Sequence, residues 1–302
     1  MKRIKESPFA KSRTKQDWEQ NATATLFLAP AVVVIGIFTL YPIVSAAYTS
    51  LTKWDGFSPT KNFVGFDNYI RLLADSEFHN SLLVTLVYAF GVCVLSIISG
   101  LTVALLLDAP LRFRSIYRTI CFLPVVTSSV AVAIVWKYML DDAGLLNALL
   151  SSIGLTGLDW LSYRWIALSA LTLLTVWKNL GFNAILYLTA LQALPVEVYE
   201  AAQLDGAGSW QQFRNITLPL LRPMTFFVLV QALINSFQAF DLVYVFTEGG
   251  PRGGTDVLGM MMFRTAFRLD DFGYGTAIAF VTLLLVMTVT LVQWRINERG
   301  EK

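Results

Sequence analysis

The sequence predicts an all-α integral membrane protein with six transmembrane helices. The chain has 302 residues, of which 55% are hydrophobic and 15% charged, and its mean hydropathy is +0.58. A soluble globular chain carries roughly 25% charged residues, so this composition indicates a chain embedded in a lipid bilayer. Six apolar runs are each long enough to cross about 30 Å of hydrocarbon as a helix. The alternating ten-residue segments of a membrane β-barrel do not appear in the sequence.

The first expected span needs a decision, because a basic segment precedes it and Val44-Ser45-Ala46 loosely resembles a signal-peptide cleavage site. Its apolar run is longer than a typical signal-peptide core and contains Pro30 and Pro42, so we favour an uncleaved span. Each span is expected to be helical because a helix satisfies its own backbone polar groups in lipid. In chain order the six spans are expected at 26–49, 82–107, 116–138, 166–193, 224–246 and 273–294.

Lysine and arginine near the span ends predict the orientation. Six of them lie in the N-terminal tail, and Arg112, Arg114 and Arg118 follow the second span. Arg295, Arg299 and Lys302 follow the sixth span, so with six crossings all three groups lie on one side. Basic residues mark the cytoplasmic side, so both termini are expected there. The predicted organisation is a tail (1–24), one membrane domain (25–295) and a second tail (296–302).

Several classes of function lack the residues they need. The cysteines, Cys93 and Cys121, lie in or beside apolar runs, with neither disulfide nor metal-site spacing. No G-x-x-x-x-G-K-[ST] phosphate-binding loop occurs, so the chain is not expected to hydrolyse ATP. No catalytic cluster is visible, and a net charge of +2 gives no reason to expect nucleic acid as a partner. We therefore expect neither an enzyme nor a metal or cofactor site.

A polar segment, "EAAQLDGAGSWQQFRNITLP" (200–219), lies in the loop 194–222 between the fourth and fifth expected spans. Pro195 and Glu197 suit the first turn of a helix, and Gly206 is expected to end that helix. Ser209 and Gln212 have the spacing of a capping box that would start a second helix. The segment is then either a connector packed on its own helices or a docking site. For docking, Ala201 and Ala202 admit a close approach and Glu200 and Asp205 offer charge.

The same segment carries a family resemblance. It fits E-A-A, three residues, G, nine residues, I-x-L-P, and so resembles the signature of permease subunits of binding-protein-dependent ABC importers. The resemblance implies the type I ABC importer permease fold and a coupling helix that docks on an ATP-hydrolysing subunit. ATP and Mg would then belong to that partner. The residues expected to couple the chain to the ATPase are Glu200, Ala201, Ala202, Asp205, Gly206, Ile216, Leu218 and Pro219.

Other segments are similar to sugar-importer permeases, among them "NFVGFDNYIRLL" (62–73) and "FRSIYRTICFLP" (113–124). Import of a sugar or oligosaccharide across a prokaryotic plasma (inner) membrane is what this resemblance implies. The implied partners are a second homologous permease, a dimer of ATP-binding subunits and an extracytoplasmic solute-binding protein. A glycerol-3-phosphate or polyol importer, and an ion-coupled secondary transporter, are the alternatives.

Polar residues within the fourth and fifth spans are candidates for the solute path, because ionisable groups in a span usually face a bundle interior or a wet cavity. The same amides also hold helices together, which is the alternative. Antiparallel packing of the two spans could bring Lys178 and Asp241 within reach of each other. The path candidates are Lys178, Asn179, Asn183, Tyr187, Asn235, Gln238, Asp241 and Tyr244.

An outer loop, "TEGGPRGGT" (247–255), contains turn-forming residues. One interpretation is a flexible loop. The family resemblance implies the other, a contact for the solute-binding protein through Gly249, Gly250 and Pro251.

Overall fold

The computed structural model describes residues 15–110 and 112–300. Within them, helices make up nearly all regular structure, which confirms the predicted fold class. Four helices are long and apolar enough to cross a membrane, or up to six spans if each of two bent helix pairs counts as one. The basic residues at 2–13 and Lys302 lie outside the described residues. The orientation that depends on them therefore stays a prediction.

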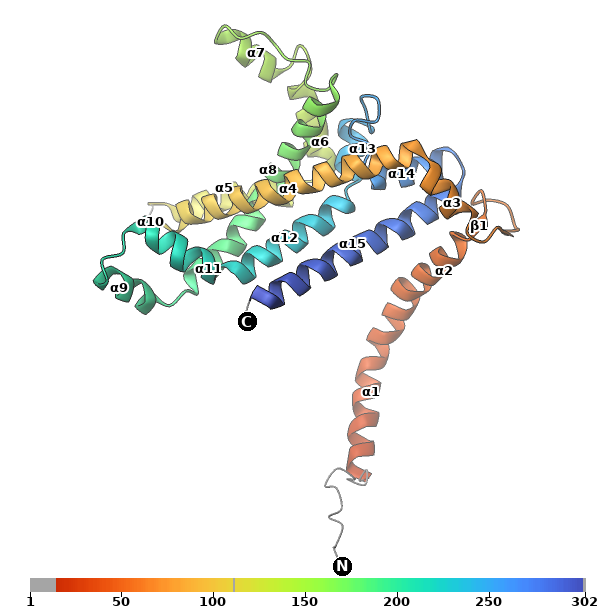
Figure 1. The fold of residues 1–302 in the computed structure, drawn as a ribbon, viewed down its shortest axis with the longest axis horizontal. Coiled ribbons are helices and arrows are strands. Elements are labelled where there is room, and N and C mark those ends of the chain that lie inside the picture. Colours follow the sequence, from red (N-terminus) through yellow and green to blue (C-terminus); the bar gives the residue numbers. More distant parts are fainter. Residues whose placement is uncertain (1–14, 111, 301–302) are drawn as a thin grey trace, which may run out of the picture.

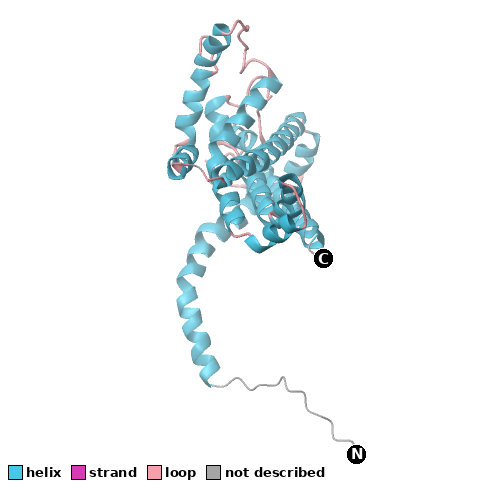
Figure 2. Cartoon of the chain, turned by 90° about the vertical axis from the view of Figure 1, so that its left-hand side faces the viewer, coloured by secondary structure: helices cyan, strands magenta, loops and turns pink. Residues whose placement is uncertain are grey.

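The first span is a continuous helical rod that extends away from the rest of the chain (Figure 1; Figure 2). It comprises α1 (Lys15–Ile35), a π-helical turn η1 (Gly36–Leu40) and α2 (Tyr41–Thr49). None of its most apolar window is buried in this chain. A short hairpin of β1 (Thr52–Lys53) and β2 (Asn62–Phe63) and the helix α3 (Asp67–Ala74) then lead into the bundle.

The bundle is formed by four long helices, α4 (Ser76–Asp108), α8 (Arg164–Gln192), α12 (Arg222–Phe237) and α15 (Phe272–Gly300). Tyr88, Leu171 and Ile278 are among the side chains that fill its core. Gly100 lets α4 approach α8, because a Cβ at this position would lie 2.9 Å from Cβ of Asn183. Such close approach at small residues is typical of helices packed in membranes.

The expected third span is a broken helix. Its halves, α5 (Arg114–Val126) and α6 (Ser129–Met139), meet at an angle of 97°. Thr127 and Ser128 adopt extended backbone between them, and Pro124, which has no backbone N–H, precedes the break. The expectation of one straight helix over 116–138 is therefore wrong. Beyond α6, the short helix α7 (Leu145–Ser152) stands at the tip of an arm (Figure 1).

The expected fifth span is also divided. Helix α12 ends at Phe237, and α13 (Asp241–Phe246) follows after a non-helical stretch. A loop then leads to α14 (Leu258–Phe263), the π-helical turn η3 (Arg264–Arg268) and α15. Between α8 and α12 the polar segment folds into α9 (Val196–Leu204), α10 (Ser209–Gln212), the π-helical turn η2 (Phe213–Thr217) and α11 (Leu218–Leu220). The α10–α11 portion meets α12 at 62°.

Candidate functional site

The polar segment α9–α11, which we call the coupling segment, lies at the opposite end of the bundle from α3 and β1 (Figure 1). Helix α9 ends in a Schellman motif, in which Gly206 N–H donates to Gln203 O at 3.0 Å and Ala207 N–H donates to Ala202 O at 2.9 Å. Gly206 has φ of +80°, a conformation that L side chains rarely adopt. The predicted helix end at Gly206 is confirmed.

Helix α10 begins one residue earlier than the capping-box pattern indicated. Gly208 is the N-cap, and its N–H donates to Oε1 of Gln211 at 2.9 Å. The amide of Gln212 instead donates to Ala207 O at 3.0 Å. The predicted Ser209–Gln212 box is therefore wrong by one residue, because a glycine can take the N-cap position that the pattern reserved for serine.

The two halves of the coupling segment are braced against each other. The Tyr199 hydroxyl of α9 and Thr217 Oγ1 of η2 form a hydrogen bond of 2.9 Å, and Thr217 is buried. The rings of Trp210 and Phe213 lie 5.6 Å apart. The hydrogen bond holds α9 against η2, and the ring contact joins α10 to η2.

One surface of the coupling segment is free of contacts with the rest of the described chain. Glu200, Ala201, Asp205 and Gly206 are exposed there, and within the described residues neither carboxylate forms an ion pair. Leu204 is 90% exposed. This face therefore presents two carboxylates and one apolar side chain to whatever lies beyond the chain.

Leu204 was not among the coupling candidates, although it lies close in sequence to Ala201 and Ala202 on the same helix. Of the remaining coupling candidates, Ala202, Ile216 and Pro219 are half-buried, and Leu218 is exposed where the segment turns toward α12.

The path candidates on α8 lie mostly in the bundle interior. Lys178 is buried, and its Nζ donates to the backbone oxygens of Thr127 at 3.1 Å and Val125 at 3.5 Å. Among the ion pairs of the described residues none joins Lys178 to Asp241. Asn183 packs against Gly100, Tyr187 is fully buried, and Asn179 Nδ2 donates to Thr175 O at 2.9 Å.

The path candidates on α12 and α13 lie nearer the surface. Asn235, Gln238 and Asp241 are exposed, and Asn235 Oδ1 accepts a hydrogen bond of 3.2 Å from Gln231 Nε2. Gln238 lies at the break between the two helices and lines a cavity of about 290 Å³ against α14 and α15. Tyr244 is half-buried, with its ring 5.4 Å from that of Phe240. None of the candidates on α8 is among the described residues that line this cavity.

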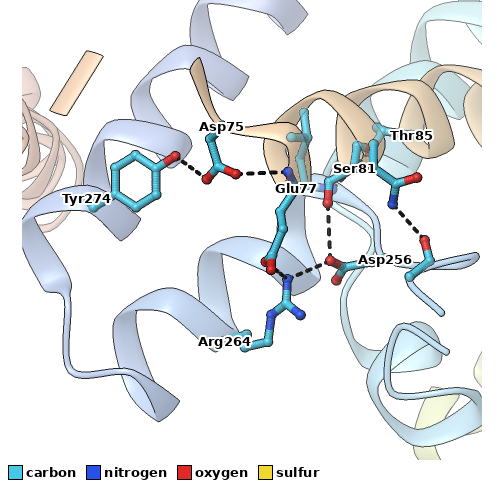
Figure 3. A network of polar contacts seen from close by, with 10 residues as sticks. Asp75, Glu77, Ser81, Thr85, Asp256, Arg264 and Tyr274 are labelled. Carbon is cyan, nitrogen blue, oxygen red and sulfur yellow. Dashed lines mark hydrogen bonds and ion pairs between the residues drawn. The ribbon is translucent and has the colours of Figure 1, made fainter. Parts of the chain in front are cut away.

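A polar network that sequence reasoning missed fastens the loop after α13 to the start of α4 (Figure 3). Asp256, whose side chain is 6% exposed, pairs with Arg264 at 2.8 Å and accepts from Ser81 Oγ at 3.1 Å. Arg264 also pairs with Glu77 at 3.0 Å. Burial raises the pKa of the Asp256 carboxyl above its ordinary value, while Arg264 and Ser81 act in the opposite direction.

Hydrogen bonds between its own residues cross-link the outer loop 247–255. The hydroxyls of Thr247 and Thr255 lie 2.6 Å apart, and Thr255 Oγ1 also donates to Gly250 O at 2.6 Å. Gly249 is buried, while Gly250 and Pro251 are half-buried. These contacts argue against the interpretation of a flexible loop, and they hold the Gly-Gly-Pro turn in one shape.

Comparison with known proteins gives consistent matches. The family model described as "Binding-protein-dependent transport system inner membrane component" matches residues 94–300. The "Probable ABC transporter permease protein YurN" of Bacillus subtilis (strain 168) is 36% identical over 282 residues, covering 92% of this chain and 96% of that protein. The "Trehalose/maltose transport system permease protein MalF" of Thermococcus litoralis is 34% identical over 285 residues, covering 94% and 96%.

A solved structure shares the fold. It is the crystal structure of a bacterial alginate ABC transporter in complex with an alginate pentasaccharide-bound periplasmic protein. One of its chains matches with a TM-score of 0.84 and 23% identity, covering 96% of this chain and 99% of that chain.

Proposed function

We propose, from the premise that this chain belongs to the family of binding-protein-dependent transport system inner membrane components, that it imports a sugar or oligosaccharide. The chain is a permease subunit of an ABC transporter and is not itself an enzyme. In our proposal ATP and Mg bind to a separate dimer of ATP-binding subunits. A second homologous permease supplies the other half of the path, and an extracytoplasmic binding protein delivers the solute.

The observation that carries this proposal is the geometry of the coupling segment. A braced, exposed body stands directly between the end of α8 at Gln192 and the start of α12 at Arg222. A force applied to that body by an ATP-binding subunit acts on both helices, because only a few residues separate it from either. The resulting tilt would open the path to alternate sides, and a solute biases these states only through its differential affinity for them.

The substrate class rests on the relatives. The names of three of them specify trehalose or maltose, lactose, and diacetylchitobiose. Sugars need hydrogen-bonding groups and aromatic faces, and Asn235, Gln238, Asp241 and Tyr244 offer both near the break after α12. We propose this break as the part of the path that the chain contributes.

Glycerol-3-phosphate or another polyol is the second candidate substrate. A phosphate would need cationic side chains in the path. Lys178 is the basic residue among the path candidates, and its ammonium group already bonds two backbone carbonyls. This arrangement favours an uncharged solute.

The outer loop 247–255 is the proposed contact for the binding protein. The braced turn at Gly249, Gly250 and Pro251 has the defined shape that a binding protein could recognise. In this orientation the coupling segment and both termini face the cytoplasm of the prokaryote, and the turn faces outward.

The experiment that tests the proposal is ATP-driven uptake of labelled oligosaccharides into proteoliposomes that hold the complete transporter, with its binding protein outside. Glu200→Lys reverses an exposed charge on the coupling segment, so we expect uptake to fall at least ten-fold and the ATP-binding subunits to co-purify poorly. Glu197→Lys, the same change at another exposed position in the first turn of α9, is the control and should retain most uptake. Wild-type uptake by the Glu200→Lys transporter would contradict the docking role.

A further inference from the structure

The break in the third span is held by three residues of α8 that lie within little more than one helical turn. The ring of Trp177 meets that of Trp136 on α6 edge-on, at 5.4 Å. Lys178 Nζ donates to two backbone carbonyls at the end of α5. Gly181 allows the backbones to cross, because a Cβ there would overlap the carbonyl oxygen of Cys121. Helix α8 therefore contacts both arms of the broken span.

The contact made by Lys178 satisfies two needs at once. The last carbonyls of a helix have no partner within it, and in an apolar bundle such groups need a donor. The carboxyl end of a helix also carries a partial negative charge that favours a cation. The lysine is 9% exposed and takes part in none of the ion pairs found among the described residues. The carbonyl oxygens of Val125 and Thr127 are its partners.

Helix α8 connects this contact to the coupling segment. The helix continues from Lys178 to Gln192, a length of about 21 Å at 1.5 Å per residue, and α9 begins at Val196. A regular helix transmits displacement along its axis. A movement of the coupling segment therefore reaches the point where the third span changes direction.

We infer that Lys178 is a positioning residue that makes the broken third span move with α8, and hence with the coupling segment. The inference rests on the proposed function, and it gives Lys178 a role other than binding the solute. Without the ammonium, the end of α5 loses its donor, and the broken span follows α8 less closely because the contact of Trp177 with Trp136 is left without its polar anchor. ATP hydrolysis then continues with less solute imported for each ATP consumed.

The test uses the complete transporter in nanodiscs, with nitroxide labels at Tyr138→Cys on α6 and Thr189→Cys on α8, both exposed positions. Cys93 and Cys121 are first replaced by alanine. Lys178→Met should broaden the distance distribution between the labels. In proteoliposomes it should lower the solute imported per ATP at least five-fold, at an unchanged solute concentration for half-maximal uptake.

Two variants test whether the effect depends on the position of the lysine and on its positive charge. Lys137→Met makes the same chemical change at an exposed site on α6 and should behave as wild type, and Lys178→Arg should stay close to wild type. Gly181→Ala leaves the ammonium in place but pushes α5 away from α8. It therefore separates Lys178 from its carbonyl partners and should broaden the same distance distribution between the labels on α6 and α8. If the Lys178→Met transporter fails to assemble, Gly181→Ala tests whether loss of this contact frees the broken span.

Two results would overturn the inference. One is an unchanged, narrow distance distribution in both Lys178→Met and Gly181→Ala. The other is a raised half-maximal solute concentration in Lys178→Met with unchanged distances, which would make Lys178 a solute ligand. A wild-type transporter that imports no sugar would refute the proposed function but would leave the label comparison interpretable.

Discussion

At the scale of single residues, Gly206 shows how one backbone conformation shapes the coupling segment. Its φ of +80° costs an L residue roughly 1–2 kcal/mol, so Gly206→Ala should fray the end of α9 and displace Leu204. We expect a several-fold loss of ATP-driven uptake, measured in proteoliposomes. Gly208→Ser is the control, because Gly208 has φ of −72°, a Cβ there would meet open space, and serine suits the N-cap position that Gly208 occupies. Equal uptake by the two variants would contradict the role of the left-handed turn.

At the scale of elements, two amides stand in the otherwise apolar fifth span. Asn235 lies near the end of α12, and Gln238 lies in the break between α12 and α13. If these amides contact the solute, Asn235→Ala and Gln238→Ala should each lower uptake at least ten-fold while the complex assembles normally. Size-exclusion chromatography and initial uptake rates measure the two effects. Thr102→Ala is the control, since the Thr102 hydroxyl is exposed on α4 and donates to Ile98 O of its own helix. Unchanged transport in both amide variants would remove these residues from the path.

At the scale of the whole molecule, the pair Arg264–Asp256 joins η3 to the loop after α13, and Ser81 and Glu77 link the pair to α4. Arg264→Met should therefore destabilise the fold. Removing one partner of a buried pair costs roughly 3–5 kcal/mol, and the partial exposure of Arg264 places this case at the lower end. Arg268→Met is the control, because its pair with Glu248 at 3.5 Å is exposed and exposed ion pairs contribute little to stability. Thermal unfolding of the purified transporter measures the difference, and equal effects would contradict the buried pair.

The pH dependence of the Arg264→Met variant follows from the raised pKa of Asp256. Burial favours the protonated carboxyl in the folded state. The loss of stability from a charged, buried Asp256 is therefore absent below the ordinary pKa of an aspartate, and it grows as the pH rises through the pKa of Asp256 in the folded protein. Without Arg264 the folded pKa rises further. The stability deficit of Arg264→Met relative to wild type should therefore shrink as pH falls, and a deficit that grows on acidification would contradict this assignment.

The sequence predicted the helical fold and the turn at Gly206 because both depend on neighbouring residues. Span length follows from a run of apolar side chains, and a left-handed turn follows from a glycine after a good helix former. The break at Thr127 was harder to see, since the apolar run continues across it and Pro124 was the one local signal. The capping box failed by one residue because serine and glycine both suit an N-cap.

The site was only partly predictable, because the sequence indicates contacts between neighbouring residues but not contacts between residues distant in the chain. The exposed face with Glu200 and Asp205 follows from local helix geometry, although Leu204 was overlooked. Lys178 was correctly expected inside the bundle, but its partners lie more than fifty positions away on α5. Ser81 meets Asp256 across 175 positions, and no spacing in the chain indicates that contact.

By itself the sequence determined that this chain is embedded in a bilayer, that its helices are long enough to cross the bilayer, and that a bent polar segment separates two of these helices. These properties come from hydrophobicity and backbone preference, which act within a few residues. The tertiary structure alone decided which carbonyls Lys178 satisfies, which acids Arg264 neutralises, and which candidate path residues are buried rather than exposed. Those outcomes depend on how helices distant in the chain cross, because buried polar groups must find donors and acceptors wherever packing places them.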